Sequence, residues 1–145
     1  YIELKQELIS KGCTFNTNSD TEVLFEALRY WGPEKACSKL NGMWAFAFFD
    51  LISGNLFLSR DRFGKKPLYY YLSDEGLYFA SEAKSLLQML GKKFSLNYQV
   101  IGEFISFEME SGKYSPVDPP MIFNWVSSLS LNRIIIVSPD ALFFA

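Results

Sequence analysis

The chain has 145 residues, of which 49% are hydrophobic, and its formal net charge is −2. The length and the apolar content predict one globular domain with a buried core and exclude a disordered chain. The small net charge argues against nucleic acid or an anionic membrane as a partner, and no apolar run reaches the ~18 residues that a membrane span needs.

Two residue counts restrict the chemistry further. The chain contains no histidine, which excludes Ser-His-Asp and Cys-His catalysis within it and the usual histidine-bearing zinc sites. Cys13 and Cys37 are too few for a disulfide framework and lack metal-ligand spacing. We therefore expect a reducing, cytoplasmic setting and small buried side chains at both positions.

The first predicted helix is short. Leu4, Leu8 and Ile9 fall on one face of it, and Gly12 ends it. Residues 13–17 then have a strand-like pattern.

A capping box begins the second predicted helix. We expect the Ser19 hydroxyl to accept a hydrogen bond from the Glu22 backbone N–H. We expect the Glu22 side chain, in turn, to bond back to Ser19. Gly32 and Pro33 close the helix. Its apolar side contains Val23, Leu24, Ala27, Leu28 and Trp31.

Two hairpins follow. Residues 42–50 alternate between two apolar sets, which is typical of a strand buried on both faces. After a turn at residues 53–55, residues 56–60 pair back with them. Residues 68–72 and 77–80 form the second hairpin.

The last part of the chain begins with a helix that Ser81 caps and Gly91 ends. The pattern weakens afterwards. Asn97 is a candidate cap for another helix, residues 115–120 form a Pro-rich connection, and residues 133–137 predict a final strand. The order of elements predicts sheet layers faced by helices.

Four segments in this order and spacing carry a family resemblance: SDTEV (19–23), LNGMWAFAFFD (40–50), RDRFGKKPLYY (60–70) and FASEAKSLL (79–87). They resemble the class II, N-terminal-nucleophile glutamine amidotransferase domain of the asparagine synthetase family. The resemblance implies an α+β fold, the Ntn-hydrolase-like four-layer α-β-β-α sandwich, incomplete here at the N-terminus. It implies a partial domain at residues 1–138 and a tail or linker at 139–145, toward an absent synthetase domain.

In that family an N-terminal cysteine attacks the side-chain amide of glutamine, with its own α-amino group as the base. The ammonia passes to a synthetase domain that uses ATP and Mg to activate aspartate. Tyr1 cannot act as such a nucleophile, and neither Cys13 nor Cys37 has a free α-amine. We therefore expect no catalytic residue, no metal and no cofactor in this chain, and no activity of the chain alone.

Asp20 is the one binding residue that the resemblance transfers to this chain. In the family, the Asp of the Ser-Asp pair receives the α-amino group of glutamine. The residues alone allow a simpler role, in which a carboxylate in the first turn of a helix stabilises the helix dipole. The resemblance favours ligand binding for Asp20 and leaves Ser19 as the cap.

The cluster at residues 60–71 mixes basic and aromatic side chains, as nucleic-acid surfaces do, but the net charge argues against that role. It also lacks the glycine pattern of a phosphate loop. We expect Gly64 to relieve strain in a tight turn of a structural segment, with a role at an interface left open.

Two alternatives remain open at this point. One is a degenerate, non-catalytic module that keeps the fold for packing or partner binding; residues 129–132 depart from the Leu-Pro-Pro-Gly of the family and support it. The other is a different class II amidotransferase, such as those making amino sugars or purine precursors. The resemblance implies glutamine as the ligand and leaves the amidated substrate and assembly into homo-oligomers open.

Overall fold

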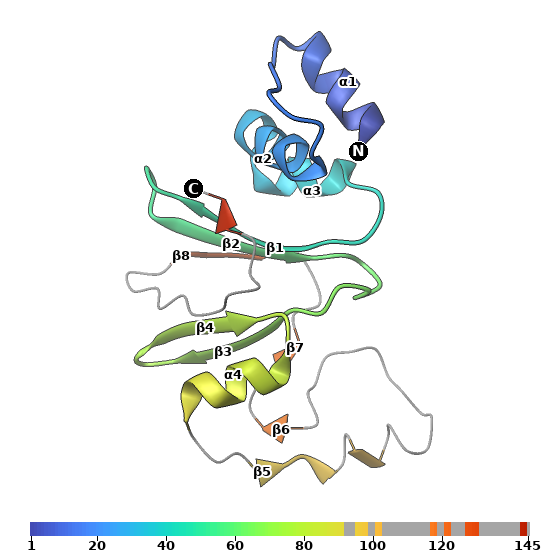
Figure 1. The fold of residues 1–145 in the computed structure, drawn as a ribbon. Coiled ribbons are helices and arrows are strands. Elements are labelled where there is room, and N and C mark those ends of the chain that lie inside the picture. The colour runs from blue at the N-terminus through green and yellow to red at the C-terminus, as the bar shows by residue number, and fades with distance from the viewer. Residues whose placement is uncertain are drawn as a thin grey trace. The chain divides into compact units, whose positions relative to one another are not determined.

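The computed structural model describes residues 1–91, 95–98, 101–102, 117–118, 121–122, 127–130 and 143–144. The chain divides into two compact units, one formed by Tyr1–Gly42 and one that begins at Met43 (Figure 1). The first unit is helical, and the second combines antiparallel strands with a helix. The predicted α+β class is therefore confirmed.

The first unit contains α1 (Ile2–Ser10), α2 (Asp20–Trp31) and α3 (Pro33–Lys39). Helix α1 ends as predicted, because Gly12 has a φ of +91° and donates its N–H to the Ile9 carbonyl at 2.9 Å.

Two expectations for this region are wrong. The side chain of Ile9 is 53% exposed and does not join the buried Leu4 and Leu8. Residues 13–17 form an irregular connection and not a strand.

Helix α2 begins at the expected place, but the expected capping box is wrong. Ser19 is the N-cap, and its Oγ accepts from the Thr21 N–H at 3.2 Å. The Glu22 carboxylate turns instead to the preceding loop, where it accepts the N–H groups of Asn16 and Thr17. The helix ends at Gly32 (φ +79°), and Pro33 is the first residue of α3.

The second unit contains two main sheets. In one, β1 (Ala45–Asp50) pairs antiparallel with β2 (Asn55–Arg60), and the sheet order is β8 (Ser127–Ser130), β2, β1, β9 (Phe143–Phe144).

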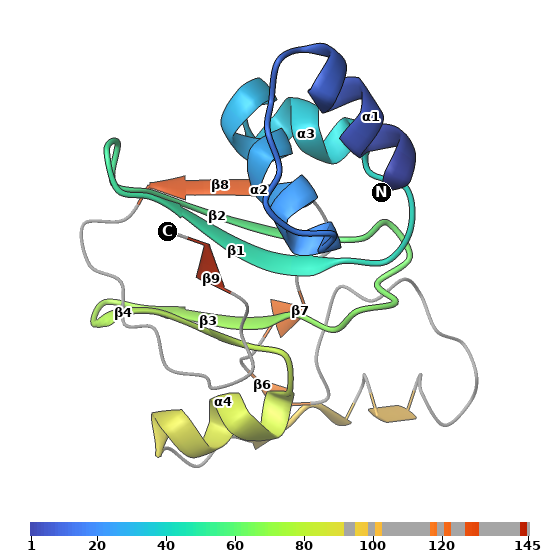
Figure 2. The ribbon, with the colours of Figure 1, turned by 45° about the horizontal axis from the view of Figure 1, so that its top comes forward.

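In the other sheet, β4 (Gly76–Ala80), β3 (Tyr69–Ser73) and β7 (Met121–Ile122) follow one another. Helix α4 (Ala83–Leu90) contacts β3 and β4 (Figure 1). Both predicted hairpins are confirmed (Figure 2). A further pair joins two short strands, β5 (Ser95–Leu96) and β6 (Val117–Asp118).

A hydrophobic core joins the two main sheets. Leu56 and Leu58 of β2 belong to the same buried cluster as Leu77 and Phe79 of β4. The opposite face of the β1–β2 sheet is also apolar and buried, since Phe46 and Phe57 there stack with ring centroids 6.4 Å apart. Strand β1 is therefore buried on both faces, as the sequence predicts.

Helix α4 ends at Gly91, whose left-handed φ of +58° confirms the predicted stop. Its N-cap is Glu82, so the expected cap at Ser81 is wrong. The strand expected at residues 133–137 and the domain end expected at residue 138 lie outside the described residues, as does most of the helix expected after Asn97.

Candidate functional site

Asp20, the binding residue expected from the sequence, is the first residue of α2. Its side chain is exposed. The Ser19 hydroxyl caps the helix. Among the described residues, the Asp20 carboxylate accepts only one hydrogen bond, a long one of 3.5 Å from the Thr21 hydroxyl. The first turn of the helix therefore leaves the Asp20 carboxylate open to a ligand, next to backbone dipoles that favour a negative charge.

The loop that leads into Asp20 is bonded to Glu22. The Glu22 carboxylate accepts the N–H groups of Asn16 and Thr17, each at 2.8 Å, and the Thr17 hydroxyl at 2.6 Å. The bond from the Asn16 amide, followed by that from the Thr17 hydroxyl, lowers the pKa of Glu22 below its ordinary value. The carboxylate is therefore ionised at neutral pH and holds the loop with charge-assisted bonds.

Lys5 of α1 contacts the same loop. Its Nζ donates to the Thr17 carbonyl at 2.8 Å and to Asn18 Oδ1 at 3.2 Å, and it lies 5.1 Å from the centroid of the Phe15 ring. Opposite charges from α1 and α2 thus hold the loop that precedes Asp20.

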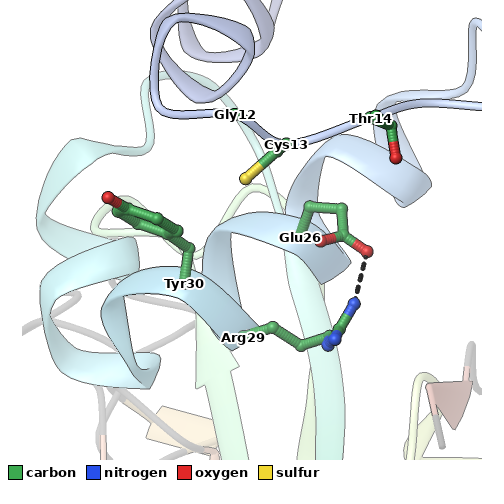
Figure 3. A pocket seen from close by; sticks show the side chains of 6 residues that line it. All are labelled: Gly12, Cys13, Thr14, Glu26, Arg29 and Tyr30. Atoms are coloured by element: carbon green, nitrogen blue, oxygen red, sulfur yellow. Dashed lines mark hydrogen bonds and ion pairs between the residues drawn. The ribbon is translucent and has the colours of Figure 1, made fainter.

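The first unit also has an open hollow of about 380 Å³, which Figure 3 shows. Glu26 and Arg29 line it and form an ion pair at 2.9 Å. Its other lining residues are Gly12, Cys13, Thr14 and Tyr30. Asp20 is not among them, so this hollow is separate from the candidate glutamine-binding residue.

The two cysteines differ in burial. Cys37 is buried in α3, as expected, whereas Cys13 is only half-buried. Neither forms a disulfide, and neither has a histidine as a base, because the chain contains none. In the described part of the chain, no group of three or more His, Cys, Asp or Glu residues is placed to hold a metal ion.

The loop after β2 is organised by a buried carboxylate that sequence reasoning treated as one charge among several. Asp61 is 1% exposed, and it accepts the N–H groups of Phe63, Lys65 and Lys66 at 3.1, 2.9 and 2.9 Å. Burial raises the pKa of Asp61, but these backbone bonds outweigh burial and hold the pKa below its ordinary value.

Arg60 completes this loop by donating to the Lys66 carbonyl at 2.8 Å and to the Gly64 carbonyl. Gly64 has a φ of +59°, which confirms the expected tight turn. Because Asp61 already occupies the loop N–H groups, the segment is not free to cradle a phosphate. Its observed role is structural.

The sequence patterns do not predict the hydrogen-bond partners of Glu22 and Asp61. The spacing of Glu22 matched a capping box, and nothing local indicated that its partners lie before the helix. For Asp61, a useful signal was present: an acidic residue followed by a glycine-containing turn is a common anchor for backbone N–H groups.

The described residues contain no helix of the length and apolar character needed to cross a membrane.

A family model for the glutamine amidotransferase domain matches residues 1–141, and the chain therefore belongs to this family. The resemblance seen in the four sequence segments is confirmed.

Three relatives are named as asparagine synthetases. Glutamine-hydrolysing asparagine synthetase 1 of Bacillus subtilis is 44% identical over 108 residues, which are 74% of this chain and 17% of that protein. The glutamine-hydrolysing asparagine synthetase 3 of the same organism is 40% identical over 85 residues, or 59% of this chain and 14% of that protein. The glutamine-hydrolysing asparagine synthetase of Gallus gallus is 37% identical over 79 residues, or 54% and 14%. This chain thus spans less than a fifth of each of these relatives.

Proposed function

We propose that the full-length protein hydrolyses glutamine to glutamate and ammonia and that Asp20 receives the α-ammonium group of glutamine. The observation that carries this proposal is the open carboxylate of Asp20 at the start of α2, whose capping is done by Ser19. A charge-assisted hydrogen bond between a carboxylate and an ammonium contributes about 1.5–3 kcal/mol. Membership of the glutamine amidotransferase family supports glutamine as the ligand.

The nucleophile in this proposal is an N-terminal cysteine outside residues 1–145, because neither Cys13 nor Cys37 carries a free α-amine. A thiolate with its own α-amino group as base needs no histidine, which agrees with the composition. Residues 1–145 alone are then inactive. Release of glutamate by the purified chain above a buffer control would contradict this part of the proposal.

In this proposal the ammonia passes to an ATP-dependent synthetase domain that amidates activated aspartate. The names of the relatives, glutamine-hydrolysing asparagine synthetases, support the link between glutamine hydrolysis and asparagine synthesis. In this proposal ATP and Mg act in the synthetase domain. The sequence contains no Gly-Gly pair and so no Ser-Gly-Gly pyrophosphate loop. A cytoplasmic setting is part of this proposal, and the lack of a disulfide between Cys13 and Cys37 fits it.

We also propose that the complete domain is a four-layer α-β-β-α sandwich. Two features of the second unit support this: two sheets share one core, and the β1–β2 sheet is buried on both faces.

The test is the steady-state release of glutamate from glutamine by the full-length protein. Asp20→Ala raises the KM for glutamine about ten- to hundredfold, the factor that corresponds to the lost hydrogen bond. Asp74→Ala, at an exposed aspartate in the turn between β3 and β4, is the matched control and leaves the KM unchanged. An unchanged KM in Asp20→Ala would refute the role of Asp20. No glutamate release and no glutamine binding by the full-length protein would favour the non-catalytic module instead.

A further inference from the structure

The loop of residues 16–19 is hydrogen-bonded to charged side chains of both helices that flank it. Glu22 of α2 accepts three hydrogen bonds from it, and Lys5 of α1 donates two to it. Thr17 meets both side chains, since its N–H and hydroxyl donate to Glu22 and its carbonyl accepts from Lys5. The loop is therefore fixed from both of its flanking helices.

A continuous line of contacts leads from Glu22 to Asp20. The Thr17 hydroxyl that donates to Glu22 also accepts the Ser19 N–H, at 3.2 Å. Ser19 is the N-cap of α2, and Asp20 follows it directly. The backbone that enters Asp20 is thus tied to the Glu22 carboxylate through one side chain, that of Thr17.

We propose that Glu22 and Lys5 are positioning residues for the glutamine site: they fix the backbone of residues 16–19 so that the Asp20 carboxylate meets the α-ammonium group of the ligand. The inference rests on the proposed binding of glutamine by Asp20. Neither residue touches the ligand in this account; both act through the loop.

A purely local function of Glu22 predicts a different geometry. A glutamate at this position of a capping box bonds back to the cap residue and stabilises its own helix. Here the helix is capped by Ser19 alone, and the Glu22 carboxylate bonds to Asn16 and Thr17. The hydrogen bonds to Glu22 fix the conformation of the loop, and this conformation sets the position of Asp20.

The positioning role has a signature that a general loss of stability lacks. Glutaramate, the glutamine analogue without the α-amino group, cannot use Asp20. A variant that displaces Asp20 therefore weakens glutamine and leaves glutaramate unchanged. A variant that damages the whole site weakens both.

The experiment measures the KM for glutamine and the inhibition constant of glutaramate in the full-length protein. Glu22→Gln keeps the size of the side chain but replaces one acceptor oxygen with an NH₂ group that faces donors. We expect the KM for glutamine to rise roughly tenfold, less than the hundredfold that a misplacement of about 1 Å can cost. The kcat and the inhibition constant of glutaramate stay unchanged. Glu34→Gln, at an exposed glutamate in the first turn of α3, is the matched control.

A double variant tests whether Glu22 acts through Asp20. Glu22→Gln added to Asp20→Ala has no further effect on the KM for glutamine, because the group that Glu22 positions is already gone. Lys5→Met is a second, independent variant that removes the opposite contact, and we expect it to raise the KM for glutamine in the same selective way. It keeps the inference testable if Glu22→Gln does not fold.

Three results would overturn the inference: a KM in Glu22→Gln and Lys5→Met equal to that of the control, equal weakening of glutamine and glutaramate, or additive effects in the double variant. In each case Asp20→Ala still raises the KM, so the proposed function survives. If Asp20→Ala itself leaves the KM unchanged, it is the proposed function that fails.

Discussion

The buried carboxylate of Asp61 gives the sharpest test of how the loop after β2 is held. Its Oδ1 accepts the N–H groups of Phe63 and Lys65, and its Oδ2 accepts that of Lys66. Asp61→Asn preserves the shape of the side chain and leaves one acceptor oxygen. With that oxygen at the Oδ1 position, the new NH₂ group faces the Lys66 N–H, and two donors then oppose each other.

The magnitude follows from these bonds. Loss of the charge-assisted bond to Lys66 costs about 1.5–3 kcal/mol, and the two bonds that become neutral weaken by about 1 kcal/mol each. Asp61 is 1% exposed, so solvent replaces none of these interactions at the carboxylate itself. Removal of a buried charge offsets part of the loss. We expect Asp61→Asn to lower the free energy of unfolding by about 2–4 kcal/mol at neutral pH.

Urea unfolding followed by tryptophan fluorescence measures this loss. Trp44 is a suitable reporter, because its carbonyl accepts the Asp61 N–H at 2.8 Å and its indole N–H donates to Ser59 Oγ at 2.9 Å. Asp74→Asn, at an exposed position, is the control and stays within about 0.5 kcal/mol of the wild type. An Asp61→Asn variant as stable as this control would refute the reasoning.

The pH dependence provides a second check on Asp61. Its pKa in the folded protein lies below the ordinary value of 3.8. A depressed pKa contributes stability that is complete above the ordinary value and disappears as the pH falls through the folded pKa. The difference between wild type and Asp61→Asn is therefore constant from neutral pH down to about 5 and shrinks below about 4. A difference that grows in acid would contradict the assignment.

The remaining predictions concern the turn and the core of the second unit. Gly64→Ala costs more than the roughly 1–2 kcal/mol of a left-handed backbone alone, since a Cβ there would displace the Arg60 guanidinium from the carbonyls of Gly64 and Lys66 to which it donates. Gly54→Ala, with a φ of +70° and open space, has only the backbone cost; equal losses of unfolding free energy in the two variants would contradict the clash. Leu58→Ala, at a fully buried side chain, costs about 2–5 kcal/mol in urea unfolding, whereas Leu72→Ala, at a side chain 51% exposed, costs far less. Comparable losses at the two leucines would argue against the core described here.

The sequence predicts well the features that depend on neighbouring residues. The hairpins follow from alternating apolar residues on both sides of short turns, and the ends of α1, α2 and α4 follow from Gly12, Gly32 and Gly91. These signals are local, so they do not depend on contacts with distant parts of the chain.

The candidate site depends on contacts that a local pattern does not contain. Lys5 reaches the Thr17 carbonyl across 12 positions of sequence, and Glu22 bonds to the loop that Lys5 holds. The capping-box pattern fails for this reason, since the loop offers Glu22 more donors than Ser19 does. Asp20 is a different case: its residue type allows a helix-end charge or a ligand, and only the family resemblance favoured the ligand. The structure adds that its carboxylate is open.

The most direct test of the central claim is a crystal structure of the full-length protein with glutamine or its product glutamate bound. We expect the α-ammonium nitrogen of the ligand at about 2.7–3.2 Å from an oxygen of Asp20, the range of a hydrogen bond. We also expect the loop of residues 16–19 in the conformation that Glu22 and Lys5 hold here. A ligand bound elsewhere, such as in the hollow beside Cys13, with Asp20 still facing solvent, would contradict the account.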